Sequence, residues 1–189
     1  LTLNGTNTYT GGTNINAGTL ALGAGANLHA SGIVNLASGA IFDLSAGSGT
    51  QQFGTLVGNG TVNLGANSIE VGGATNGTFS GSIAGTGGLT KVGTGIETLT
   101  GANTYTGGTF ITAGTLAIGP GGSLAATGAV TLSAAGTGFD ISTAGANQTI
   151  GSLNGVAGST VSLGAQTLTL GGVGNSLFDG AISGTGGLV

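Results

Sequence analysis

The sequence contains no cysteine, methionine, tryptophan or arginine, and one lysine among 189 residues. Without cysteine it has no disulfide framework, no thiol chemistry and no cysteine-based metal site. Its formal net charge is −4, and it lacks the lysines and arginines with which proteins neutralise nucleic-acid phosphates or bind anionic membrane surfaces. We therefore expect no nucleic-acid partner.

Long apolar runs are also missing. Residues 1–20 lack the basic region and the continuous apolar region of a signal peptide, and no apolar run is long enough to span a bilayer. We expect this segment not to insert into a membrane, and any export signal or anchor to lie outside it.

Glycine, by contrast, is abundant, with 45 residues. Disordered chains combine few apolar residues with high net charge. Here 39% of residues are hydrophobic and only 3% are charged. The composition therefore predicts a collapsed chain in which glycine serves frequent tight turns.

The chain consists of two tandem copies of one unit. Residues 2–23 and 98–119 agree at 17 of 22 positions, and further matching blocks follow at nearly the same offset. We expect a single continuous domain over residues 1–189, with a first copy at 1–88, entered part-way, and a second at 89–189.

Short segments such as TLAL, IVNL, TVNL and TLTL alternate apolar and small polar residues between glycine-rich breaks. Period-2 alternation over four to six residues is the signature of β-strands, so the fold class is all-β. Near-identical short strands favour a β-helix (β-solenoid), in which each coil packs on the next. With coils of roughly 20 residues, about nine coils would form a rod on the order of 45 Å long.

The motif NTYTGGT occurs in both copies and contains both tyrosines. Its residues are Asn7, Tyr9, Gly11, Gly12, Thr13, Asn103, Tyr105, Gly107, Gly108 and Thr109. We interpret it as a structural corner: asparagine tolerates left-handed backbone, Gly-Gly supplies positive φ, and the tyrosine covers an apolar patch while its hydroxyl reaches water or a carbonyl. The alternative is a tyrosine and asparagine platform that stacks on a sugar.

The segment GGLTKVGTGIETLTGANTYTGGTFITAGTLAIG (87–119) resembles the passenger-associated repeat of autotransporters. The first copy matches the same pattern from Leu1 through Leu20. This resemblance implies a right-handed parallel β-helix, export across a Gram-negative outer membrane and an extracellular or bacterial outer-membrane surface location. It implies a stalk more directly than it implies an activity.

Glu97 departs from that pattern, which has an apolar residue at this position. Glu97 shares strand parity with Leu99, so its carboxylate is predicted to point into the core, and the only lysine, Lys91, precedes it across a glycine-rich turn. One hypothesis is a Lys91–Glu97 ion pair. The alternative is that both side chains are solvated at a strand end, where a pair contributes little stability.

No catalytic or metal site is predicted, and no cofactor is expected. The acids are Asp43, Glu70, Glu97, Asp140 and Asp179, and Asp43 and Asp140 are one position in two copies, expected to lie too far apart to cooperate as paired carboxylates. The lone His29 has no nearby cysteine, aspartate or second histidine and is expected to be a turn residue.

The leading functional hypothesis is a structural, non-enzymatic stalk of an autotransporter-type adhesin at the cell surface. A self-assembling extracellular fibre or biofilm-matrix subunit is the alternative, because few charges protect exposed β edges. A polysaccharide-active β-helix enzyme and a threonine-rich ice-binding protein are remote alternatives. The expected partners are homotypic, or glycans or proteins of a host or matrix surface.

Overall fold

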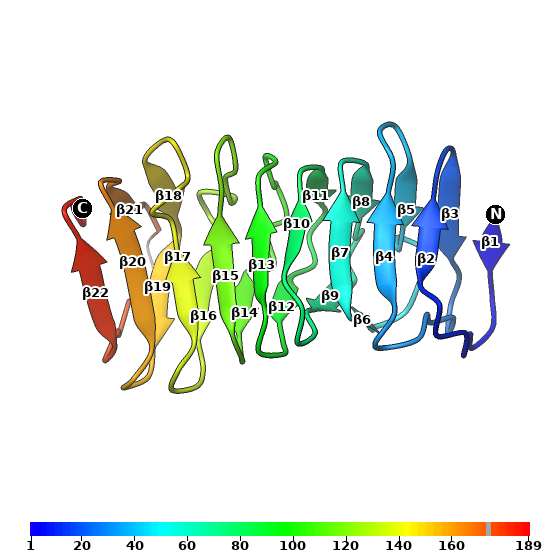
Figure 1. The fold of residues 1–189 in the computed structure, drawn as a ribbon, viewed down its shortest axis with the longest axis horizontal. Helices are drawn as coiled ribbons and strands as arrows, with labels where there is room; N and C mark the ends of the chain where they lie inside the picture. Colours follow the sequence, from blue (N-terminus) through cyan, green and yellow to red (C-terminus); the bar gives the residue numbers. More distant parts are fainter. Residues whose placement is uncertain (173–174) are drawn as a thin grey trace.

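The computed structural model describes residues 1–172 and 175–189, which form a rod of stacked coils (Figure 1). All strand pairs in the described part are parallel, and it contains no helix and hence none that could cross a membrane. The prediction of an all-β, parallel solenoid is therefore confirmed.

The strands line up along three faces of the rod, although some coils have no strand on the first or the second face. The first face is the five-stranded sheet of β1 (Thr2–Leu3), β3 (Thr19–Leu22), β5 (Ile41–Asp43), β8 (Thr61–Asn63) and β11 (Ser82–Ala84). The second face is the six-stranded sheet of β6 (Thr50–Phe53), β9 (Ser68–Val71), β12 (Leu89–Lys91), β14 (Thr109–Ile111), β16 (Ala129–Leu132) and β19 (Ser152–Gly155).

The third face is the longest and runs through both sequence copies without interruption. Its nine strands are β2 (Thr13–Ile15), β4 (Ile33–Leu36), β7 (Thr55–Gly58), β10 (Gly77–Phe79), β13 (Ile96–Leu99), β15 (Thr115–Ile118), β17 (Gly138–Asp140), β20 (Thr160–Gly164) and β22 (Ala181–Gly184). A two-stranded sheet of β18 (Gln148–Ile150) and β21 (Leu168–Leu170) takes the place of the first face in the later coils. Along the chain, β18 lies between β17 of the third face and β19 of the second, and β21 follows β20 of the third face.

The register shows that coils differ in length. Along the third face, Leu99 pairs with Ile118 in the next coil, whereas Leu116 pairs with Phe139, so the second of these coils is the longer. Nine strands on this face correspond to about nine coils, as predicted. Insertions of a few residues are absorbed in the corners between strands, where they leave the ladder intact.

The interior is a continuous apolar column. Alternating residues such as Val62 and Leu64, or Val161 and Leu163, are at most 4% exposed, as their strand parity predicted. Phe42 and Phe53 meet edge to face, with ring centroids 6.1 Å apart. Each coil therefore buries its inner side chains against the coils before and after it.

The two sequence copies do not occupy equivalent faces. Strand β3, in the first copy, belongs to the first face, but its sequence counterpart β15 belongs to the third. Likewise β2 lies on the third face and its counterpart β14 on the second. One unit thus comprises four complete coils plus two further faces, and the second copy is turned by one face relative to the first.

Candidate functional site

The repeated motif lies at a corner between coils, and its asparagine links three of them. In the second copy, Asn103 Nδ2 donates to the carbonyls of Gly101 (2.8 Å) and Ser123 (3.0 Å). Its Oδ1 accepts the backbone N–H of Ile83, 3.1 Å away in the preceding coil. Because Asn103 is only 2% exposed, these bonds satisfy backbone groups that water does not reach.

Asn7 repeats half of this arrangement in the first copy. Its Nδ2 donates to Gly5 (2.8 Å) and to Asn27 in the next coil (2.9 Å), and no preceding coil within the described residues contacts its Oδ1. Neither asparagine has a positive φ, so the expectation that they use left-handed backbone is wrong. Their role is to hydrogen-bond neighbouring coils.

Only the second glycine of each Gly-Gly pair has the expected backbone conformation. Gly12 and Gly108 have φ values of 83° and 88°, a region that favours glycine. Gly107 is required for a different reason, because a Cβ on it would lie 2.5 Å from the carbonyl carbon of Gly87 in the preceding coil. At Gly11 a Cβ would meet nothing within 4 Å.

Each motif tyrosine bonds to the threonine that ends the motif, rather than to water or to a carbonyl as predicted. The hydroxyl oxygens are 2.7 Å apart for Tyr105 and Thr109 and 2.9 Å apart for Tyr9 and Thr13. Tyr105 is 2% exposed whereas Tyr9 is 42% exposed. Burial raises the pKa of the Tyr105 hydroxyl well above its usual range. A ring buried to this extent cannot stack on a sugar, so the platform alternative fails for the second copy.

Lys91 lies inside the rod at the end of β12. Its side chain is fully buried, and Nζ donates to the carbonyls of Val92 (2.6 Å), Gly93 (2.8 Å) and Ala113 (3.2 Å). Burial lowers the pKa of the ammonium group, and the nearby Glu97 carboxylate opposes that shift. The expectation of a solvated lysine is therefore wrong.

Glu97 also points inward, as its strand parity predicted, and is 1% exposed. Within the described residues its Oε1 has no hydrogen-bond partner, and the Lys91 ammonium is hydrogen-bonded to carbonyls instead. Burial raises the pKa of Glu97 to about 8, against the opposing effects of a backbone hydrogen bond from Leu56 and the charge of Lys91. The two groups interact electrostatically without forming a hydrogen-bonded ion pair.

Asp43, Asp140 and the histidine lie apart from this corner. Asp43 and Asp140 each accept a backbone N–H from the turn that follows, from Ser45 at 3.0 Å and Ser142 at 2.8 Å. They lie on different faces, in β5 and β17, and each shapes the turn after its strand. His29 bonds locally, as expected of a turn residue, with Nδ1 3.0 Å from the hydroxyl of nearby Ser31.

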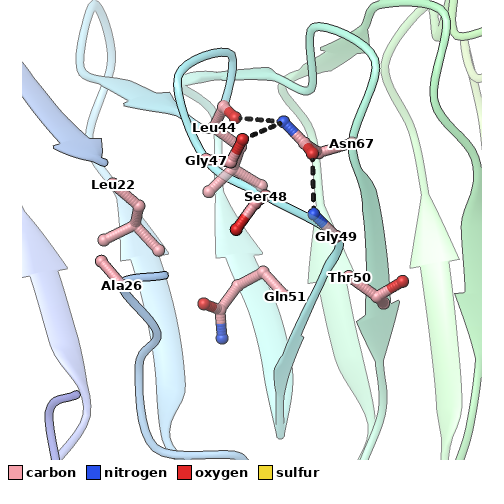
Figure 2. A pocket seen from close by; sticks show the side chains of 9 residues that line it. All are labelled: Leu22, Ala26, Leu44, Gly47, Ser48, Gly49, Thr50, Gln51 and Asn67. Atoms are coloured by element: carbon pink, nitrogen blue, oxygen red, sulfur yellow. Dashed lines mark hydrogen bonds between the residues drawn. The ribbon is translucent and has the colours of Figure 1, made fainter. Parts of the chain in front are cut away.

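Sequence reasoning missed several amide side chains that hold the corners. Figure 2 shows Asn67, whose Nδ2 donates to the carbonyls of Leu44 (2.7 Å) and Gly47 (3.2 Å) and whose Oδ1 accepts from Gly49 N–H (3.0 Å). The adjoining cavity is about 20 Å³, enough for one water molecule. Gln148 similarly donates to a carbonyl of another coil, 3.2 Å away. An amide in a glycine-rich turn was the available signal, but its partners lie in other coils.

A larger hollow of about 500 Å³ opens on the exposed side of the first coil. Leu1, Leu3, Tyr9, Ile15 and Leu20 contribute to its lining. This lining is the apolar interior of the first coil, without the charged side chains that orient a ligand in a typical binding pocket. We assign no ligand to it.

The fold defines the chain as a parallel β-solenoid, and the recurring corner motif defines the repeat from which it is built. The family model of the passenger-associated-transport-repeat matches residues 1–22 and 89–118, so the chain carries two copies of this repeat. The resemblance to autotransporter passenger repeats is confirmed, and it implies a secreted or surface-exposed protein. No curated protein and no solved structure matches the chain.

Proposed function

We propose that this chain is a non-catalytic length of the stalk of an autotransporter-type adhesin, a rod that holds other parts of the protein away from the cell surface. The offset between the two copies carries this proposal. Inward residues of both copies build one core, while corresponding outward residues fall on different faces. A spacer needs only the continuous core, whereas a repeated ligand site needs the same outward surface each time.

The placement of the acids supports a non-catalytic role. Asp43 and Asp140 lie on different faces, and each carboxylate accepts a hydrogen bond from the turn that follows its strand. Glu97 is buried in the interior. Glycoside hydrolysis commonly needs two carboxylates flanking one bond. Among residues 1–172 and 175–189, no three histidine, cysteine, aspartate or glutamate side chains gather where they could hold a metal ion.

The lack of basic side chains on the outer surface favours partners that are not polyanions. Lys91 is the only lysine and is buried, so no lysine or arginine side chain is left on the outside of the rod. Such a surface offers nothing to neutralise phosphates. We propose that any partner is another copy of the chain, or a glycan or protein of a host or matrix surface, and that the chain works outside the cell.

A self-assembling fibre is the second candidate, favoured by apolar side chains on the outer faces. Ile33, Ile96 and Phe110 are 50%, 40% and 45% exposed, and few charges separate them from neighbouring molecules. Uncharged β surfaces of this kind are prone to associate. In this role the rods would join through their sides or ends in a biofilm matrix.

The ice-binding alternative is disfavoured by the placement of the threonine pairs on different faces. The pair Thr98 and Thr100 follows the third face, whereas the backbone amides of Thr104 and Thr106 bond to the coil that contains the first-face strand β11. Paired threonines therefore form no flat array on one face. Absence of thermal hysteresis is the expected result of a direct assay.

Electron microscopy combined with light scattering over a concentration series tests the stalk proposal. We expect discrete monomeric rods on the order of 45 Å long. Filaments with a β spacing along their axis, or a mass that rises with concentration, would contradict the stalk and support the fibre.

A further inference from the structure

The solenoid interior contains one carboxyl group among the described residues, and the backbone around it is arranged to leave room for that group. Glu97 pairs in register with Gly77 on one side and with Leu116 on the other, so its side chain occupies a core position of the third face. A Cβ on Gly77 would lie 2.5 Å from Glu97 Oε2. The missing side chain at Gly77 is therefore the space that the carboxyl group fills.

An ionised carboxylate would lack a full set of hydrogen-bond partners in this position. Oε1 has no partner among the described residues, and a buried charge without full hydrogen bonding is costly. Strands β10 and β15 flank the strand of Glu97, and Leu56 of β7 makes a backbone hydrogen bond to its carboxyl group. None of these three strands contributes a titratable side chain. Among the described residues, Lys91 of β12 is the one charged group that acts on Glu97, and its ammonium already donates to three carbonyls.

We propose that Glu97 is a neutral carboxylic acid in the folded solenoid at neutral pH, so that the corner joining β12 to β13 is a proton-sensitive joint in an otherwise apolar core. Loss of the proton places a second, incompletely bonded charge beside Lys91 and loosens this corner. The joint lies midway along the rod, where the second copy begins (Figure 1).

The direction of the pH effect follows from linkage. Burial raises the pKa of Glu97 from 4.5 to about 8, so between these values the folded state binds the proton more tightly than the unfolded state. The stabilising effect of the proton is fully present below pH 4.5 and is lost as the pH rises towards 8. This dependence is opposite to that of carboxylates stabilised by ion pairs.

The chain is well suited to a direct measurement, because Glu70 and Glu97 are its only glutamates. Protein labelled with ¹³C at the glutamate carboxyl carbon should give two carbonyl resonances, assigned with Glu70→Gln and Glu97→Gln. We expect the Glu97 resonance to titrate near pH 8. Titration of the Glu97 resonance near 4.5 would overturn the proposal, and this test uses the wild-type fold.

Thermal unfolding from the acidic to the mildly alkaline side of this range tests the consequence for stability. The wild-type melting temperature should fall by several degrees as the pH rises. Glu97→Gln, which keeps the shape without the titration, should flatten the profile, whereas Glu70→Gln, on the outer side of β9, should leave the fall unchanged. A fall of equal size in Glu97→Gln would show that other groups cause it and would contradict the proposal.

Lys91→Met provides a readout that a merely structural glutamate would not give. Removing the positive charge takes away an effect that lowers the pKa of Glu97. The carboxyl resonance should therefore titrate at a higher pH than in the wild type. An unchanged midpoint in a folded variant would show that the two groups are not coupled and would overturn the part assigned to Lys91.

Discussion

The two copies of NTYTGGT differ in how deeply their side chains are buried, although their sequences are identical. In both, the asparagine binds a carbonyl of its own turn and a carbonyl of the next coil, and the tyrosine binds the threonine hydroxyl. Yet Tyr105 is 2% exposed and Tyr9 is 42% exposed. The internal bonds belong to the motif, whereas burial depends on the coils stacked on either side.

This comparison teaches what the motif does in the fold. If it were a binding element, its exposed atoms would be its constant feature. Instead the constant feature is a set of hydrogen bonds that close a corner and connect it to the next coil. The second copy adds a bond to the preceding coil, between Asn103 Oδ1 and the Ile83 amide.

The largest expected difference between the copies is at the first glycine of the pair. Gly107→Ala would place a Cβ 2.5 Å from the Gly87 backbone, which cannot move without disturbing the ladder. We expect a loss of about 3 kcal/mol in the free energy of unfolding. Gly11→Ala is the matched control, since its Cβ would contact nothing within 4 Å, and should be close to neutral. Denaturant titration of both variants measures the difference; equal losses would contradict the account.

The asparagines should show the next largest difference. Asn103→Ala leaves the buried Ile83 N–H without a partner and removes the side-chain bonds to the carbonyls of Gly101 and Ser123, which keep their backbone donors. It should cost about 2–3 kcal/mol. Asn7→Ala affects exposed groups that water can satisfy and should cost about 1 kcal/mol or less. The same denaturant titrations apply. A greater loss at Asn7 would mean that the first coil, not the stack, sets the stability.

The tyrosine hydroxyls should show the smallest difference. Tyr105→Phe removes one buried bond and leaves Thr109 Oγ1 without it, which should cost about 1–2 kcal/mol. Tyr9→Phe should change stability by less than about 0.5 kcal/mol, because water replaces the exposed bond. Thermal unfolding of the two variants, with Thr109→Val as a further check on the buried bond, measures this difference. Equal losses at the two tyrosines would show that burial does not set the strength of the bond.

Much of the architecture could be predicted from the sequence. Alternation in segments such as TVNL showed which side chains point inward, and the spacing of the glycine-rich breaks indicated the number of coils. The offset between copies could not be read from the repeat length alone, because the coils differ in length, as the pairings of Leu99 with Ile118 and of Leu116 with Phe139 show. Whether a unit holds a whole number of coils depends on how each corner folds.

The corner that holds Lys91 and Glu97 was predicted only in part, for a related reason. Strand parity correctly placed Glu97 inside, but local sequence cannot show what lies opposite it in the neighbouring coils. Gly77 makes room for the carboxyl group from the preceding coil, and Ala113 supplies a carbonyl to Lys91 from the following one. These partners are set by coil register, which the sequence reveals only after the fold is known.

A disulfide test addresses most directly the claim that both copies stack in one continuous solenoid. Thr78, in the first copy, and Thr98, in the second, are register partners on the outer side of the third face. Adjacent strands are about 4.8 Å apart, within reach of a disulfide, and the chain has no cysteine of its own.

The Thr78→Cys/Thr98→Cys variant should oxidise almost completely to the intramolecular disulfide, which non-reducing electrophoresis and mass spectrometry detect. Thr78→Cys/Thr90→Cys, which spans two faces, is the matched control and should remain reduced. Crosslinking in the second pair but not in the first would contradict the account.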